Sequence, residues 1–347
     1  MPENGNRRSV PVCVIVPAWN AAGSIARTLE SIASQTVAPR ETIVIDDGST
    51  DGTQTLVREF IATHPGFDIR LVEQANAGAA AARNAGIRAT TAEYVAFLDA
   101  DDCWLPQKLA HTLPLLRDPT VQIAATDMLV DDGSGELTVM ECAKRFAGPQ
   151  DAFTTQFLKG SIATSTVIAR RAAVLAADGF DESLGAAHDY DLWVTILDRH
   201  RDGLAMLDEP LTIYDGRLQG ITGNAERRRR CSLEVVYRFG GRFGLRSAFI
   251  SLLRVALVQR QAFQTHRAKG SRKGMALAVL TALPAGVFAL LALAFPAVRK
   301  PGPDEPGIRV SRAATLGAGL IAIAVIGGWL AQFGGIAGAV LRVLGLG

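Results

Sequence analysis

The sequence contains few cysteines, and their arrangement excludes one class of site. Only four occur among 347 residues, and none forms a CxxC pair. A structural zinc site is therefore not expected, and a reduced, cytosolic catalytic domain is the simplest interpretation. The N-terminal stretch MPENGNRRSV has no apolar run of the kind found in a signal peptide, so we expect no secretory leader.

Two phosphate-binding signatures are also missing. No GxGxxG follows the first predicted strand, and no GxxxxGK occurs anywhere. These absences argue against a nicotinamide dehydrogenase, which is the main enzyme alternative for an α/β chain. The formal net charge is only +2, so overall charge decides little, and we expect no nucleic-acid partner.

Charge is absent from two long segments near the C-terminus. Residues 275–298 and 313–341 carry none, and each exceeds the ~20 residues that span a bilayer. The alternative is a pair of buried core helices. We predict membrane segments at about 275–298 and 313–335. A basic, amphipathic, interfacial region over 233–274 would join them to a catalytic domain over 1–232.

The membrane topology stays open at this stage. The flank before the first segment and the loop after it are both basic, and two full spans cannot place both on the cytoplasmic side. Either the loop crosses despite its charge, or the first segment is re-entrant or interfacial. We favour a two-span hairpin with both ends in the cytoplasm.

Short apolar runs alternate with helical patterns over the first hundred residues. Continuously apolar strands that alternate with helices predict an α/β fold with a Rossmann-like, mostly parallel sheet covered by helices on both faces. Ligands of such sheets bind at the carboxyl ends of the strands. The predicted strands are 10–16, 42–45, 69–72 and 94–98, and the predicted helices are 24–34, 54–62 and 79–89. Later elements are a helix over 107–117, a strand over 121–128, a turn at 131–135 and a helix from about 189.

Polar residues follow the first two predicted strands. Pro17, Ala18 and Asn20 come after the first, and Asp46 and Asp47 after the second. A carboxylate there can accept a hydrogen bond from a base N–H or a ribose hydroxyl. The alternative is that this loop only caps the next helix, and we expect that role for Asp51.

Arg83 lies in an alanine-rich helical segment that follows the third strand. Its guanidinium could neutralise a phosphate or contact the base. The alternative is a buried helix with an arginine at its edge.

Three acids follow the fourth strand, and this is the most informative cluster. Asp99, Ala100, Asp101 and Asp102 come directly after a buried strand. The carboxylates would repel one another unless a positive group compensates them, and a hard divalent cation bound to a diphosphate would do so. The alternative is a solvated acidic turn.

A fourth cluster contains His188, Asp189 and Asp191 at the start of a predicted helix. A helix N-terminus stabilises an ionised carboxylate, which suits Asp189 as a general base. The alternative is that Asp189 and Asp191 only cap the helix. His188 could be a partner that supports the site residues, but we expect it at the surface.

Together these motifs resemble the family 2 glycosyltransferases. The matching segments, in order across about residues 12–193, are VPAWN, SIASQT, VIDDGSTDGT, NAGAAAARNAGI, YVAFLDADDCWLP and GFDESLGAAHDYDLW. The resemblance implies the GT-A fold, a nucleotide-diphosphate sugar donor (with a UDP-sugar expected) and a divalent cation, Mg²⁺ or Mn²⁺.

The resemblance also implies roles for individual residues. Asp99 and Asp101 would form the metal-binding DxD site, with Asp101 as the direct ligand, and Asp189 would be the base. His188 stands where the family often has glutamate. The implied nucleotide-sugar contacts are Pro17, Ala18, Asn20, Asp46, Asp47, Arg83, Asp99 and Ala100.

The function that this resemblance implies is inverting sugar transfer to a hydroxyl acceptor, lipid-linked or glycan, in polysaccharide or cell-envelope synthesis. The predicted membrane segments would place it at a bacterial inner membrane, with the catalytic domain facing the cytoplasm. The alternatives are an inactive membrane scaffold that keeps the fold and a polyprenyl-phosphate sugar synthase.

Overall fold

The structure is a computed structural model that describes residues 8–216 and 224–294. Its chain divides into two compact units. The first holds the residues up to 219, apart from 157–159 and 185–187, and the second holds those two short pieces together with residues from 220 onward.

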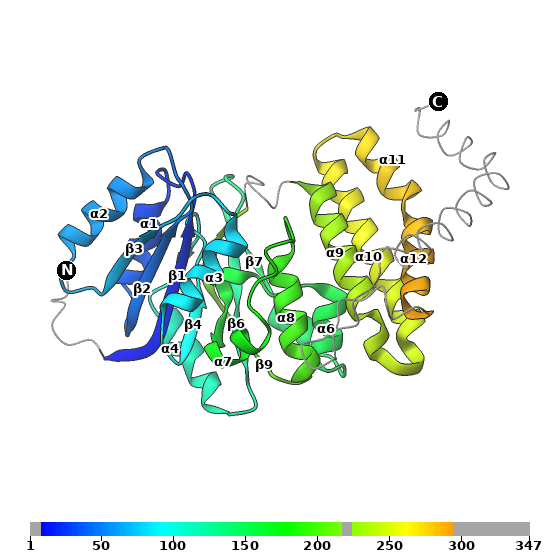
Figure 1. Cartoon of the computed structure of the whole chain (residues 1–347), viewed down its shortest axis with the longest axis horizontal. Coiled ribbons are helices and arrows are strands. Elements are labelled where there is room, and N and C mark those ends of the chain that lie inside the picture. The colour runs from blue at the N-terminus through cyan, green and yellow to red at the C-terminus, as the bar shows by residue number, and fades with distance from the viewer. Residues whose placement is uncertain (1–7, 217–223, 295–347) are drawn as a thin grey trace. The chain divides into compact units, whose positions relative to one another are not determined.

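Four parallel strands form the N-terminal half of the sheet in the first unit. They lie in the order β3-β2-β1-β4 and confirm the predicted parallel arrangement for this half (Figure 1). Their apolar runs are buried because helices cover both faces. The strands are β1 (Ser9–Ala18), β2 (Ala38–Asp46), β3 (Ile69–Glu73) and β4 (Tyr94–Phe97).

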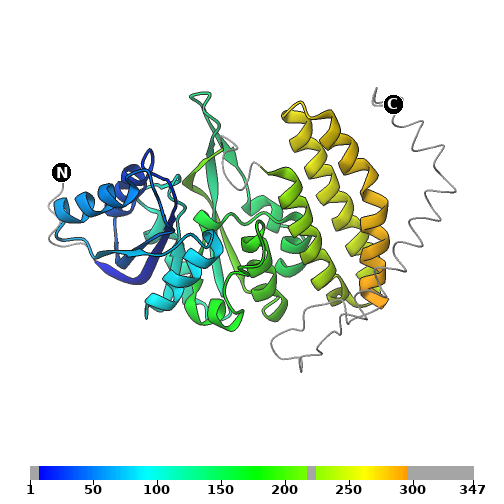
Figure 2. The ribbon, with the colours of Figure 1, turned by 45° about the horizontal axis from the view of Figure 1, so that its top comes forward.

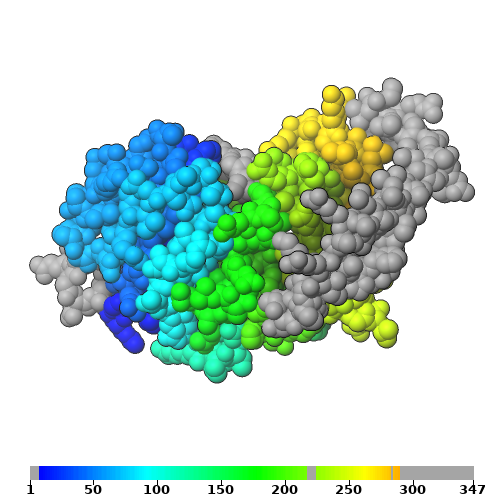
Figure 3. All heavy atoms as spheres, in the orientation of Figure 1, coloured from blue at the N-terminus to red at the C-terminus, as the bar shows by residue number. Residues whose placement is uncertain are grey.

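The predicted helices connect these strands. They are α1 (Ile25–Ala33), α2 (Thr53–Thr63) and α3 (Ala79–Ala89). Glycine lets α3 pack closely on β1, since a Cβ at Gly86 would lie 2.5 Å from Cγ2 of Ile15. In the space-filling view the atoms of residues 8–100, blue to cyan, lie together on the face that is shown (Figure 3).

The other half of the sheet is mixed, so the prediction of a mostly parallel sheet is wrong there. β8 runs antiparallel to both β4 and β6, β9 runs parallel to β6, and β5 pairs antiparallel with β9. β6 and β7 form a hairpin that projects from the first unit, teal in Figure 2. The bounds are β5 (Cys103–Trp104), β6 (Ile123–Asp131), β7 (Leu137–Met140), β8 (Ile168–Arg170) and β9 (Leu204–Asp215).

The later helices of the first unit follow the acidic residues in the chain. The predicted helix over 107–117 is α4 (Lys108–Thr112), continued by a 3-10 helix to Arg117. α8 (His188–Arg199) begins where expected and buries Leu192, Trp193, Ile196 and Leu197. The remaining helices are α5 (Ala143–Phe146), α6 (Ala152–Lys159), whose last three residues belong to the second unit, and α7 (Arg171–Ala176).

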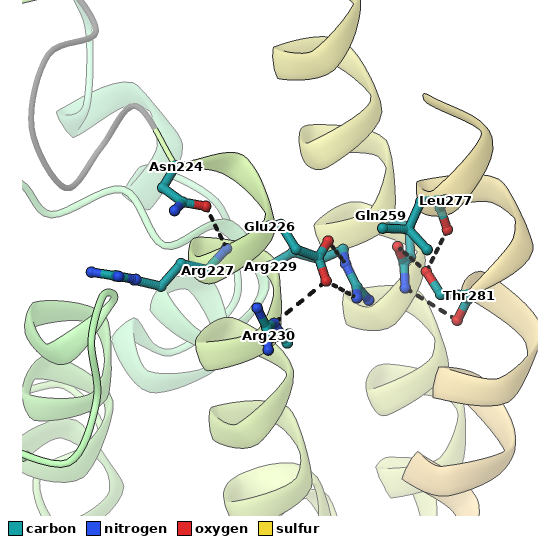
Figure 4. Close-up of polar contacts among 8 residues, drawn as sticks. All are labelled: Asn224, Glu226, Arg227, Arg229, Arg230, Gln259, Leu277 and Thr281. Atoms are coloured by element: carbon teal, nitrogen blue, oxygen red, sulfur yellow. Dashed lines mark hydrogen bonds and ion pairs between the residues drawn. The ribbon is translucent and has the colours of Figure 1, made fainter. Parts of the chain in front are cut away.

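The second unit is a bundle of helices with polar contacts within and between its helices. Glu226 accepts hydrogen bonds from Arg229 at 2.6 and 2.8 Å and lies 3.5 Å from Arg230, while Gln259 contacts Thr281 (Figure 4). The helices are α9 (Ala225–Phe239), α10 (Ser247–Ala268), α11 (Arg272–Leu280) and α12 (Ala282–Ala294).

The predicted apolar segment 275–298 is not one helix in the structure. Its described part is divided between α11 and α12 at Thr281. Pro284 explains the break, because proline has no N–H to donate to the carbonyl of Leu280. Across the described ranges, no helix is both long enough and apolar enough to cross a bilayer. The second predicted segment, 313–335, lies outside the described residues.

Candidate active site

The loops after β1 and β2 are tied together at the predicted nucleotide edge. The backbone N–H of Asn20 donates to Oγ of Ser49, and the N–H of Thr50 donates to Oδ1 of Asn20, both at 2.9 Å. Asn20 has φ = 50°, a left-handed conformation that asparagine tolerates better than most residues. Its amide oxygen therefore serves the loop itself.

Pro17 and Ala18 are buried at the end of β1, and Trp19 beside them is 59% exposed. Trp19 belongs to the sequence motif VPAWN but was not among the predicted site residues. A large aromatic ring left in solvent at this edge is the kind of surface on which a nucleobase stacks.

Asp46 and Asp47 are both buried but have different partners. Oδ2 of Asp46 accepts from Gln54 at 2.6 Å and from the N–H of Ser49 at 3.1 Å. Its Oδ1 is buried with no hydrogen-bond partner in the structure, as in a site that a ligand or water completes.

Both oxygens of Asp47 are used by the chain. Gln74 and the N–H of Ala77 donate to Oδ1, at 2.7 and 2.9 Å, and the N–H of Gly78 donates to Oδ2 at 2.8 Å. Asp47 thus fixes the loop that precedes α3. Of the two carboxylates, Asp46 is the one with an unused oxygen.

Arg83, Asp99 and His188 form the centre of the site. Arg83 Nη2 donates to Oδ1 of Asp99 at 2.5 Å, and Nη1 lies 2.7 Å from Nε2 of His188. The expectation of a surface histidine is wrong, because His188 is only 7% exposed. Burial, followed by the charge of Arg83, lowers the pKa of His188. The structure thus brings together residues that lie on α3, after β4 and on α8.

Asp101 and Asp102 have different surroundings. The pKa of Asp101 is raised to about 6, mainly because its carboxyl group loses water and to a smaller extent because Asp99 is negatively charged. The residue as a whole is exposed. Asp102 is buried and accepts from Ser165 Oγ at 2.5 Å and from the N–H of Asp215 at 2.9 Å. Asp102 therefore supports the loop, and Asp101 faces solvent.

Helix α1 holds the acidic loop, a role that the sequence analysis missed. Thr28 Oγ1 lies 2.9 Å from the carbonyl of Ala100 and 2.8 Å from that of Asp102. Gln35 donates to the carbonyl of Leu105 at 2.8 Å. Thr28 and Ser31 are the sequence signal, because they are polar residues on the buried face of α1.

Asp189 is joined to the acidic loop through two adjacent residues. Thr164 Oγ1 donates to Oδ2 of Asp189 at 3.2 Å, and the N–H of Asp99 donates to Oγ of Ser165 at 3.1 Å. Asp189 is half-buried in the first turn of α8. Thr164 and Ser165 were also missed, since nothing in their local sequence distinguishes them from ordinary loop residues.

The donor set fits a divalent cation that is shared with a phosphate. Asp99 and Asp101 supply carboxylate oxygens, the ligands that Mg²⁺ and Mn²⁺ prefer. Arg83 uses Oδ1 of Asp99, which leaves Oδ2 for a cation. The described residues contain no cluster of three or more His, Cys, Asp or Glu ligands. The other ligands would then come from the donor diphosphate and water.

Comparison with known proteins identifies the family to which the chain belongs. Residues 13–175 match the family model for glycosyl transferase family 2. The amylovoran biosynthesis glycosyltransferase AmsB of Erwinia amylovora is 31% identical over 216 residues, which cover 60% of this chain and 70% of AmsB. The uncharacterized glycosyltransferase YibD of Escherichia coli K12 is 45% identical over 111 residues. This chain spans 32% to 60% of the length of YibD and three other uncharacterized relatives.

Solved structures show the same fold. TarS of S. aureus in complex with UDP-GlcNAc aligns with a TM-score of 0.58 at 18% identity, over 83% of this chain and 90% of that one. The mannosyltransferase PcManGT of Pyrobaculum calidifontis, solved with GDP-Man and Mn²⁺, aligns with a TM-score of 0.53 at 21% identity, over 85% and 90%. These structural similarities support an α/β, GT-A-like fold. The family is shown by the 31% identity to AmsB, which extends over 70% of its length. The chain belongs to glycosyltransferase family 2.

Proposed function

We propose that the protein is a metal-dependent, inverting glycosyltransferase that moves a sugar from a nucleotide-diphosphate sugar to a hydroxyl acceptor. The observation that carries the proposal is the convergence of Asp99, Arg83 and His188, with Asp101 beside them and Asp189 joined to the same loop. Such a cluster of acids and one arginine suits a ligand that contains both a cation and a diphosphate.

The residues divide the chemistry between them. Asp189 would take the proton from the acceptor hydroxyl as its oxygen attacks the anomeric carbon, and a positioned base contributes roughly 10²–10⁴-fold. The bond to the diphosphate breaks on the opposite face, which inverts that carbon. A cation held by Asp99 and Asp101 would offset charge on the departing diphosphate. Arg83 would add positive charge behind Asp99.

Relatives support the class of donor and the biological setting. AmsB is named for amylovoran biosynthesis, and the TarS and PcManGT structures hold UDP-GlcNAc and GDP-Man. We therefore infer a nucleotide-sugar donor, with a UDP-sugar as the first candidate, and a role in polysaccharide or cell-envelope glycan synthesis with a glycan or lipid-linked acceptor.

The experiment is a turnover screen of UDP-, GDP- and dTDP-sugars with Mn²⁺, followed by NMR of the product. We expect one donor class to be consumed, with the anomeric configuration inverted in the product. Consumption of no donor would remove the activity, and retention of configuration would remove the assigned role of Asp189.

We also propose that the protein works at the inner face of a bacterial inner membrane. Residues 224–294 contain thirteen Lys and Arg but only two Glu, a net charge of +11, so the rest of the chain carries −9. Seven of the eleven exposed large apolar side chains among the described residues also belong to this unit. They are Leu245, Phe249, Leu252, Leu253, Leu277, Val279 and Leu280. Basic charge with exposed apolar groups suits anionic lipid, at about 1 kcal/mol per cationic side chain near the surface.

A further inference from the structure

The protonation of His188 follows from its contact with Arg83. A guanidinium can only donate hydrogen bonds, so the nitrogen 2.7 Å from Arg83 Nη1 must accept. Nε2 therefore carries a lone pair, and the proton of the neutral ring is on Nδ1. Burial, and to a smaller extent the charge of Arg83, lower the pKa of His188, which favours this neutral form of the ring. Asp189 and Asp99, the nearby acids, oppose this shift without reversing it.

Arg83 is held on three sides. His188 accepts from one amino group, Asp99 accepts from the other, and the ring of Phe180 lies 5.4 Å from the guanidinium carbon. Phe180 also packs edge-on against the His188 ring, with centroids 5.9 Å apart. Its backbone is fixed in turn by Asn84, which bonds both its N–H, at 2.9 Å, and its carbonyl, at 2.8 Å.

The choice of a neutral partner affects the charge at the site. Arg83 is 4% exposed, so its charge is poorly screened by water. A carboxylate in place of His188 would neutralise it a second time, because Asp99 already forms an ion pair with it. A neutral imidazole accepts the hydrogen bond without neutralising the charge of Arg83. That charge is then balanced only by Asp99, which in turn is proposed to bind the cation.

We propose that His188 is a positioning residue that aims Arg83 at Asp99, and so sets the orientation of the first carboxylate of the cation site. This inference rests on the proposed function, since it concerns the same cation and donor. In this proposal His188 acts through Arg83, which it contacts directly. A purely structural role would require only that an aromatic ring fill the space against Phe180, and the two roles can be separated by substitution.

The test compares His188→Phe with His188→Gln in the full-length protein. Phenylalanine keeps a ring against Phe180 but cannot accept from Arg83, whereas the Oε1 of glutamine can lie near the position of Nε2. The measurement is Mn²⁺ binding in the presence of UDP or GDP. The concentration of free Mn²⁺ is determined from its EPR signal. The Mn²⁺ concentration for half-maximal turnover and the donor KM are measured beside it. His111→Gln is the matched control, because His111 is half exposed and pairs with Glu209 on the surface.

We expect His188→Phe to weaken Mn²⁺ binding by about 10–100-fold, the usual effect of losing a partner that orients a metal ligand. The donor KM should rise with it, while kcat at saturating Mn²⁺ changes less. His188→Gln should stay within ~3-fold of wild type. Should His188→Phe fail to fold, His188→Asn, whose oxygen falls short of Arg83, replaces it in the comparison with glutamine.

Equal Mn²⁺ binding by wild type and His188→Phe would overturn the inference, and so would equal losses in the phenylalanine and glutamine variants. A wild-type protein that binds no Mn²⁺ and turns over no donor would instead count against the proposed function.

Discussion

Among single residues, Asp189 is the proposed general base. Its half-buried carboxylate lies in the first turn of α8 and accepts from Thr164. Asp189→Asn keeps the size and one oxygen of the side chain but cannot take a proton. We expect turnover to fall by roughly 10²–10⁴-fold, with donor binding within a few fold of wild type.

Single-turnover transfer and titration with nucleotide and Mn²⁺ measure these two quantities. Asp132→Asn, in the exposed turn of the β6–β7 hairpin, is the control for loss of a carboxylate. Near-normal transfer by Asp189→Asn would show that another group acts as the base.

The candidate acids can be located from the sequence, but their partners cannot. Asp99 and Asp101 could be chosen because they directly follow a buried strand, and Asp189 because it lies at the start of a helix in a segment that resembles the family motif. The burial of His188 could not, because it depends on Arg83, 105 residues earlier in the chain. Likewise, Asp47 looked like Asp46 in the sequence, and only the loop from Gln74 to Gly78 distinguishes them.

Among the elements, α1 has the most direct influence on the site. Thr28 is fully buried and contacts the carbonyls of Ala100 and Asp102 on either side of Asp101. Thr28→Val has nearly the same shape but leaves these carbonyls without their donor. We expect the free energy of unfolding to fall by about 1–3 kcal/mol, and Mn²⁺ activation to weaken because the loop is released.

Urea unfolding and Mn²⁺ titration of turnover measure the two effects of Thr28→Val. The control is Thr63→Val at the exposed end of α2. The hydroxyl of Thr63 contacts two carbonyl groups of its own helix and the ring of the adjacent His64. If Thr28→Val is destabilised but activated by Mn²⁺ as wild type is, α1 supports the fold and not the site.

Buried strands could be predicted from the sequence more easily than half-buried or short ones. Strand β4 and the C-terminal parts of β1 and β2 are buried on both faces, so they contain apolar runs that are clear in the sequence. Strand β9 is only half-buried along most of its length and contains charged residues, so it has no long apolar run from which it could be predicted. The antiparallel partners β5, β7 and β8 have two to four residues each, too few to show any period.

For the whole molecule, the uneven distribution of charge gives a testable consequence. If the basic helices contact lipid through charge, and the uncharged residues 313–341 insert, the two attachments should respond differently to salt. In vesicle flotation the full-length protein should float with anionic vesicles even at 1 M NaCl, where the Debye length is about 3 Å.

A variant that ends at Ala294 should float with anionic vesicles at low salt and be released at high salt. Zwitterionic vesicles are the control for the charge effect. Full-length protein that stays in solution without detergent, and floats with neither kind of vesicle, would contradict the membrane proposal.

The central claim, that Asp99 and Asp101 gather a cation needed for sugar transfer, is tested most directly by one comparison. Turnover of the identified nucleotide-sugar is measured for wild type and Asp101→Ala, each with Mn²⁺ and with EDTA, after confirming that both unfold at the same temperature. We predict turnover only for wild type with Mn²⁺. Equal turnover by Asp101→Ala, or by wild type in EDTA, would contradict the account.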